Sequence, residues 1–166
     1  MPQTQEGPKK IKPKGLADYL DVLTRAVFQS GISWKVVEAK WPGATEAFGG
    51  FDPEHVANLS PPDIDALVAD TRLIRNRAKI EATVQNAETM LELDRANGSF
   101  KKYLRSFPTC DALQADLVKR FKFLGNLGAY WFLHVVGEET PPHEDWMATY
   151  KPEGLGAKAR PARPKA

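Results

Sequence analysis

Cysteine is nearly missing from this chain: Cys110 is the only one among 166 residues. A single thiol excludes an internal disulfide, and it excludes zinc or iron–sulfur sites that are built from several cysteines. A reducing environment is the simplest setting for such a sequence. We therefore expect a cytoplasmic protein.

Long apolar runs are missing as well. The longest one, residues 129–137, contains His134 and is far too short to span a bilayer. The N-terminus is polar and rich in Pro and Lys, which is unlike a signal peptide. With 42% hydrophobic and 27% charged residues, the composition is that of a soluble globular domain without a membrane partner.

The common catalytic motifs are also absent. The sequence has no phosphate-binding P-loop and no glycine-rich dinucleotide fingerprint. His55, His134 and His143 each lack a His or Cys partner three or four residues away, so their spacing predicts no metal site. No Ser/His/Asp arrangement can be argued. Carboxylates are present near the end of the chain, in Glu144 and Asp145, and a carboxylate beside a pocket can assist hydrolysis.

Positive charge is concentrated at the two ends of the chain. The net charge is +2, but residues 1–15 carry +3 and residues 151–166 carry +4, which leaves −5 for residues 16–150. Both ends lack an apolar period, so we expect disordered basic tails on either side of one domain over 16–150. Such tails are consistent with salt-sensitive attraction to nucleic acid, and equally with solubility.

The ordered region has a helical apolar period and no alternation typical of strands. Leu16, Leu20, Leu23 and Val27 share one face of a first helix over 16–28. Proline, glycine and capping residues punctuate the rest of the chain. The pattern predicts further helices over 34–41, 45–48, 53–57, 61–68, 75–96, 99–107, 109–123 and 129–136, and a last turn at 145–146. We therefore expect a compact all-α domain of nine or ten short helices.

The stretch 121–137 reads as the end of one helix, a tight turn and a very apolar second helix. Lys119, Arg120 and Lys122 stand before a turn at 124–128, where glycine and asparagine tolerate positive φ. The first amides of the second helix would be open to an anion, and the neighbouring cations favour a phosphate of DNA or RNA. An ordinary helix–turn–helix corner with solvated lysines is the alternative.

Two other stretches allow a functional and a structural interpretation. Trp34 follows a glycine loop at a helix start, where it could stack on a base or simply pack two helices together. Arg75, Arg77 and Lys79 cluster at the start of the longest helix, where the helix dipole disfavours cations. Phosphate contact is one reason for such a cluster, and salt bridging to nearby acids is the other.

Together, six segments resemble the DNA-3-methyladenine glycosylase I family, which belongs to the helix-hairpin-helix glycosylase superfamily. The resemblance covers residues 19–132, and Tyr130 and Phe132 also match. The segments follow the order and nearly the spacing of the family. They are GISW at 31–34, AFGGFDPEHVANL at 47–59, PPDIDALVAD at 61–70, LIRNRAKIEATVQNA at 73–87, GSFKKYLRSF at 98–107 and FKFLG at 121–125.

The resemblance implies an all-α fold that binds duplex DNA through the hairpin, flips a damaged base out and hydrolyses its N-glycosidic bond. It implies a monomer without a cofactor, associated with the nucleoid when bound to DNA. Trp34 and Tyr130 would form the base pocket, and Ile32 would be the wedge in the DNA. The implied phosphate contacts are Arg75, Arg77, Lys79, Lys122, Gly125, Asn126 and Gly128.

The chain also departs from the family. The residues that would complete the family's zinc site are missing, so we expect no metal. The acid that helps to recognise the base aligns with Ala26. Asp145 follows the hairpin at nearly the spacing of the catalytic aspartate in many superfamily members, and is our candidate to stabilise an oxocarbenium-like transition state. The alternative is a descendant of the family that binds DNA but has lost base excision.

Overall fold

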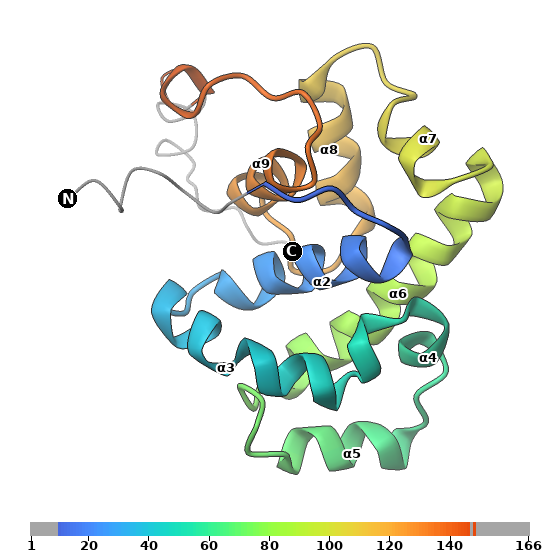
Figure 1. Ribbon diagram of the computed structural model, residues 1–166, viewed down its shortest axis with the longest axis vertical. Coiled ribbons are helices and arrows are strands. Elements are labelled where there is room, and N and C mark those ends of the chain that lie inside the picture. Colours follow the sequence, from blue (N-terminus) through green and yellow to red (C-terminus); the bar gives the residue numbers. More distant parts are fainter. Residues whose placement is uncertain (1–9, 147, 149–166) are drawn as a thin grey trace.

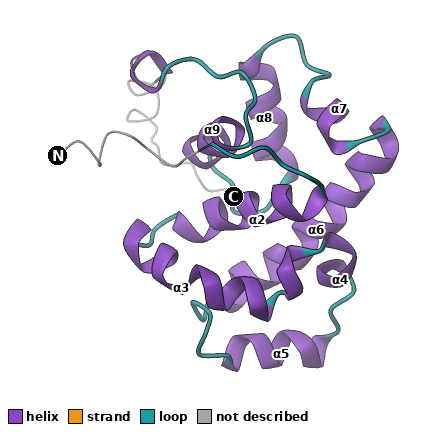
Figure 2. Cartoon of the chain, in the orientation of Figure 1, coloured by secondary structure: helices purple, strands orange, loops and turns teal. Residues whose placement is uncertain are grey.

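The computed structural model describes residues 10–146 and 148. Across these residues the chain forms helices joined by loops, with no strand (Figure 2), which confirms the predicted all-α class. The elements are α2 (Leu16–Gln29), α3 (Trp34–Ala47), the 3-10 turn η1 (Gly49–Phe51), α4 (Pro53–Ala57), α5 (Pro61–Ala69), α6 (Arg77–Asn97), α7 (Phe100–Leu104), α8 (Cys110–Arg120) and α9 (Asn126–Val135). A further helical turn begins at residue 143.

Helix α2 lies at the centre of the fold. Figure 1 shows it between α8 and α9 on one side and α3, α4 and α5 on the other, with the long α6 crossing behind. Leu20, Leu23 and Val27 are fully buried because their spacing of three and four residues places them on one face. Each such side chain contributes about 1.5–3 kcal/mol on burial. This apolar face fixes the positions of the elements that carry the candidate site.

Capping side chains begin several helices where the sequence predicts. Ser60 and Asp63 form a reciprocal capping box at the start of α5, and Thr109 accepts a bond from the Ala112 N–H at the start of α8. The longest helix begins at Arg77, two residues later than predicted. Asn76 is its cap, since its side chain accepts a hydrogen bond from the Lys79 N–H at 3.1 Å.

The predicted end of the helix that begins at Trp34 is wrong for a reason of packing. Helix α3 does not stop at Pro42 but continues to Ala47. Its buried stripe of Val37, Trp41 and Ala44 runs across the proline, and this burial outweighs the one helical bond that proline removes.

The second correction concerns the turn after α8. Asn126 and Gly128 were expected to set it, but both belong to the first turn of α9. The residue with positive φ is Phe123, at 60°. Gly128 is small for another reason: an added Cβ would lie 3.2 Å from Leu124 Cδ1 and 3.7 Å from Ala26 Cβ. Gly128 therefore allows α9 to approach α2.

The expected basic tails fall mostly outside the described residues, which exclude 1–9 and 149–166. Residues 10–15 are described, and the Ile11 N–H donates to the Val135 carbonyl oxygen at 2.7 Å. The segment expected as an N-terminal tail therefore contacts the end of α9 at residue 11.

Candidate nucleic-acid interface

The first turn of α9 forms one side of a hairpin with the last turn of α8. Helix α9 begins at Asn126, after Gly125, and no side chain caps this end. Its first hydrogen bond runs from the Ala129 N–H to the Gly125 carbonyl oxygen at 2.9 Å. The amides of Leu127 and Gly128 precede that bond, so the helix dipole and these amides favour an anion here.

Two buried amide side chains hold the backbone of this hairpin. Asn86 of α6 is 1% exposed, and its Oδ1 accepts a hydrogen bond from the Lys122 N–H at 2.8 Å. The Asn86 Nδ2 donates to the Lys122 carbonyl oxygen at 3.2 Å. Gln114 of α8 is buried as well and donates to the Asn126 carbonyl oxygen at 3.1 Å. Both ends of the connection are thus tied to neighbouring helices.

Cations and exposed apolar side chains surround the turn. Lys119 and Lys122 are exposed and form no ion pair within the described part of the chain. Arg120, by contrast, pairs with Asp116 at 2.7 Å, and this contact raises the arginine's pKa. Phe123 is 53% exposed. The hairpin therefore presents two unpaired positive charges next to an exposed aromatic ring.

The loop between α2 and α3 carries the predicted wedge, and the predicted stacking residue follows it as the first residue of α3. Trp34 is 51% exposed, so it is not the buried packing residue that the structural interpretation required. Ile32 is partly buried against the core. Gly31 has a φ of 80°, a conformation that glycine adopts without strain. The end of this loop and the start of α3 thus present Trp34 to the outside, with Ile32 partly exposed beside it.

Lys79 lies inside the fold and does not point outward. Its ammonium group donates to the carbonyl oxygens of Phe28 and Ser30, where α2 ends. Burial lowers the pKa of this lysine. The structure therefore places this predicted phosphate contact beneath the loop that carries Trp34, which it supports through carbonyl groups.

The two arginines of the same cluster differ. Arg77 pairs with Asp65 at 2.6 Å and with Glu81 at 3.4 Å, as the salt-bridge interpretation suggested. Arg75 precedes the helix, is exposed, and forms no ion pair among the described residues. Arg75 is thus the member of the cluster whose charge is available to a ligand.

Tyr130 is buried on the side of α9 that faces the C-terminal segment. Its ring stacks on Trp146 at 4.7 Å between centroids, and its hydroxyl donates to the Pro141 carbonyl oxygen at 2.8 Å. Burial raises the pKa of this tyrosine. The ring contacts of Tyr130 are with Trp131, His134, His143 and Trp146, and none of those in the described residues is with Trp34.

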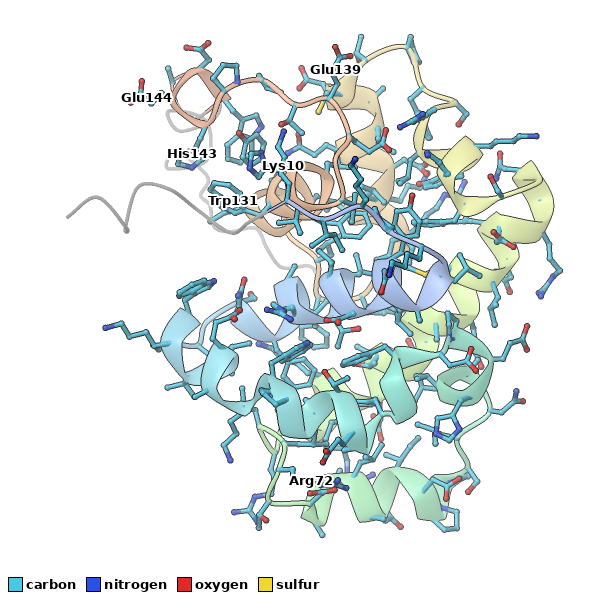
Figure 3. All side chains as sticks on the ribbon, in the orientation of Figure 1. Lys10, Arg72, Trp131, Glu139, His143 and Glu144 are labelled. Atoms are coloured by element: carbon cyan, nitrogen blue, oxygen red, sulfur yellow. The ribbon has the colours of Figure 1, made fainter. Side chains whose placement is uncertain are left out.

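The C-terminal segment docks on α9 through aromatic rings. His143 stacks on Trp131 at 4.9 Å, and Figure 3 shows both beside Lys10 at one corner of the molecule. Asp145 is exposed and lies next to the buried Trp146 in the same helical turn. The stacking of Trp146 on Tyr130 thus ties the candidate carboxylate to α9.

Position 26 faces the start of α9. Ala26 lies close to Gly128, as the 3.7 Å separation from an added Cβ indicates. The neighbouring Arg25 turns toward α3, where its Nη1 donates to both carboxylate oxygens of Glu38, at 2.9 and 3.0 Å. Ala26 of α2 and Gly128 of α9 therefore meet where these two helices approach each other. Residue 26 has no carboxylate side chain.

The residues near α9 do not fit a zinc ion. Within the described residues, no three His, Cys, Asp or Glu side chains gather closely enough to hold a metal. His143 uses its ring face against Trp131, and Cys110 is half-buried on α8, where its thiol lies 3.9 Å from Gln114 Oε1. Across the same described part of the chain, no helix is both long and apolar enough to cross a membrane.

Sequence reasoning missed Asn86 and Gln114. Asn86 lies between Thr83 and Met90 on the buried face of α6, and a polar residue at such a position is a signal that something must satisfy it. The pattern cannot identify the partner, because Lys122 is 36 residues away.

Comparison with known proteins gives one consistent result. A family profile described as methyladenine glycosylase matches residues 15–115. A DNA-3-methyladenine glycosylase of Haemophilus influenzae is 35% identical over 130 residues, covering 66% of this chain and 70% of the relative. DNA-3-methyladenine glycosylase 1 of Escherichia coli is 33% identical over the same length and shares of each chain.

Solved structures agree with the sequence relatives. The 3-methyladenine DNA glycosylase I of Staphylococcus aureus, whose structure concerns recognition of 3-methyladenine, superposes with a TM-score of 0.68. It is 28% identical, and the match covers 78% of this chain and 80% of that one. A solution structure of a 3-methyladenine DNA glycosylase I gives a TM-score of 0.64 at 28% identity, covering 80% of each chain.

Proposed function

The chain belongs to the methyladenine glycosylase family, and from this premise we propose that it is a base-excision repair enzyme acting on alkylated purines such as 3-methyladenine in DNA. Water attacks C1′ of the deoxyribose: its oxygen bonds to C1′ as the C1′–N9 bond breaks. The bonding electron pair leaves with the purine, and the proton that the water loses passes to solvent. Because an N3-alkylated adenine is cationic in the nucleoside, it departs as a neutral base and is a good leaving group. The enzyme then needs to bind, flip and orient the nucleotide more than it needs to protonate it.

The observation that carries this proposal is the α8–α9 hairpin on a fold that matches known glycosylases. The open amides of Leu127 and Gly128 bind a DNA phosphate, and Lys122 lies beside them. Gly125 precedes α9 in an extended backbone conformation, and Asn126 is the first residue of the helix. The contact positions the duplex without reading its sequence.

Further cations extend this contact. Arg75 has no competing ion pair among the described residues, so it binds a phosphate directly. Arg77 can contribute only by exchanging its pairs with Asp65 and Glu81. Lys79 acts indirectly, by holding the carbonyl groups at the end of α2.

The loop between α2 and α3 handles the flipped base. Trp34 offers an exposed aromatic face on which a flipped purine stacks, and Ile32 fills the gap left in the duplex. Tyr130 acts indirectly, because its stacking on Trp146 and its hydrogen bond to the Pro141 carbonyl oxygen hold the C-terminal segment against α9. The enzyme acts as a monomer in the cytoplasm, on duplex DNA of the nucleoid.

Asp145 provides the negative charge for the transition state. As the purine leaves, positive charge develops on the sugar, and a carboxylate across a short gap stabilises it. Asp145 is exposed in the free protein and is held close to α9 by Trp146. Bound DNA would remove water from this region and strengthen the interaction.

A second candidate function is DNA binding without base excision, and Ala26 is the observation that favours it. Position 26 carries no acid to hydrogen-bond the base. Release of bases from methylated duplex DNA separates the two functions when it is compared with a control without protein. Retained DNA affinity with no release would refute the enzyme and support the alternative.

The role of Asp145 is tested by Asp145→Asn. We expect a loss of about 10²-fold or more in single-turnover base release, with DNA affinity retained, because removing a transition-state charge contact typically costs that much. Glu144→Gln, one residue away and also exposed, is the matched control and should keep its activity. Equal activity of Asp145→Asn and the wild type would eliminate Asp145 from catalysis.

A further inference from the structure

Two phenylalanines have a backbone conformation that phenylalanine rarely adopts. Phe51 and Phe123 both have a φ of 60°, and they are the non-glycine residues with positive φ in the described chain. For a bulky residue this left-handed conformation is strained, and it persists only where the surrounding structure imposes it. Each of the two therefore needs an interaction that offsets the strain.

Phe51 obtains that interaction within the fold. Its side chain is fully buried, and its ring stacks on Trp41 at 5.5 Å and on Phe48 at 5.2 Å. Burial of an aromatic ring in such a cluster is worth more than the backbone strain. The positive φ of Phe51 thus has a structural explanation.

Phe123 has no such explanation inside the chain. Its side chain is 53% exposed, and it makes no ring contact with any described aromatic residue. The conformation is nevertheless fixed, because Asn86 holds both the N–H and the carbonyl group of the preceding residue, Lys122. The fold thus holds the ring of Phe123 outward at the tip of the α8–α9 hairpin.

The surroundings of Phe123 suit a nucleic-acid strand. Lys119 and Lys122 are exposed and unpaired within the described residues, and Leu127, 49% exposed, adds a second apolar side chain. A DNA strand alternates anionic phosphates with the apolar faces of its deoxyriboses. A cation beside an exposed ring complements that alternation, whereas a ring alone would not distinguish DNA from an apolar protein surface.

We infer that Phe123 is a DNA-contacting residue that packs on a deoxyribose next to the phosphate held by the hairpin, and that Asn86 is the positioning residue that keeps it there. This inference rests on the proposed function for its ligand. It adds an apolar contact to a surface that otherwise acts through charge and backbone amides. It also explains why a phenylalanine occupies a position where glycine would be less strained.

The test is Phe123→Gly in the full chain. If Phe123 is a DNA contact, the substitution should weaken DNA binding and leave stability unchanged or higher. If Phe123 is a packing residue, the substitution should lower stability. Glycine adopts this φ freely, so the thermal midpoint should stay the same or rise. Affinity for an undamaged duplex, measured by fluorescence anisotropy at fixed salt, should fall about tenfold, the effect of losing one aromatic contact with a nucleotide. Phe123→Leu should recover part of that affinity.

Phe51→Gly is the matched control, with the same residue and the same φ in a buried place. It should lower the thermal midpoint clearly, while the folded protein keeps wild-type DNA affinity. Wild-type affinity of Phe123→Gly would overturn the inference. A fall in both its thermal midpoint and its affinity would also overturn it, since the ring would then be a packing residue.

Failure of this inference can be told apart from failure of the proposed function. If the wild type binds duplex DNA but releases no methylated base, the glycosylase proposal fails, and a tenfold weaker Phe123→Gly still supports the contact. If the wild type releases bases and Phe123→Gly binds as tightly as the wild type, only the inference fails.

Discussion

Asn86 connects the long helix α6 to the hairpin, and Asn86→Ala tests how much that connection contributes. The substitution removes the acceptor of the Lys122 N–H, at 2.8 Å, and the donor to the Lys122 carbonyl oxygen, at 3.2 Å. The side chain is 1% exposed, so its removal leaves a space that solvent does not easily fill. Both backbone groups of Lys122 lose their partner at once.

The expected destabilisation follows from these contacts. Two neutral hydrogen bonds contribute about 2 kcal/mol in total, and a backbone group left without a partner adds about 1–3 kcal/mol if water cannot reach it. Because Lys122 itself is exposed, water can reach part of its peptide. We therefore expect a loss of about 2–4 kcal/mol in the free energy of unfolding.

Equilibrium urea unfolding followed by circular dichroism measures this loss. Asn97→Ala is the matched control, because Asn97 lies at the end of the same helix and its amide, among the residues that the structure describes, donates to the Leu93 carbonyl oxygen alone, at 2.9 Å. That variant should lose less than about 1 kcal/mol, as expected for one hydrogen bond at a helix end. If Asn86→Ala lost no more stability than Asn97→Ala, the two hydrogen bonds from Asn86 to Lys122 would not stabilise the fold as proposed. DNA affinity should also fall in Asn86→Ala and stay unchanged in Asn97→Ala.

Two further predictions concern titratable groups whose pKa is lowered by burial, the buried Lys79 and the half-buried His134. Lys79→Met should cost about 1–3 kcal/mol in urea unfolding and slow base release, because it removes the donor to the carbonyl groups of Phe28 and Ser30 at the end of α2. Burial lowers the pKa of Lys79 below 10.5, so the unfolded chain binds the proton more tightly than the folded one. The free energy of unfolding of the wild type should therefore rise relative to that of Lys79→Met as pH approaches 10.5. A difference between the two proteins that does not change with pH would contradict this. Burial, and then the charges of Lys10 and His143, lower the pKa of His134 below 6.5, so stability should fall as pH decreases below 6.5. A His134→Gln variant should show a weaker decline in the same urea titration, and an identical decline would exclude His134 as its cause.

The local signals in the sequence predicted the helices well. Ser60 caps α5 and Thr109 caps α8, and such caps can be read locally because capping depends on residues only a few positions apart. Pro42 misled the prediction, since a helix-breaking residue was outweighed by an apolar stripe that packs on distant elements. Position and type of most elements were thus predictable, while boundaries depended on packing.

The candidate site was predictable to a smaller extent. Trp34 and Lys122 lie on the surface, as a binding role requires. Lys79 looked equivalent to its neighbour Arg77, yet its ammonium turns inward to carbonyl groups about 50 residues earlier in the chain. Tyr130 was expected in a pocket with Trp34, but its ring faces Trp146. Whether Asp145 acts on DNA stays a prediction.

The sequence by itself determined the all-α class, the family and the location of the hairpin. These properties come from periodicity, caps and short motifs, in which the interacting residues are neighbours along the chain. Only the tertiary structure decided that Asn86 forms hydrogen bonds with the backbone of Lys122. It also decided that Phe123, and not a glycine, is the residue of the turn with positive φ. Those contacts join helices that are tens of residues apart, and a side chain's partner at that separation depends on how the whole core packs. The same packing places Phe123 outward beside the cations of the hairpin.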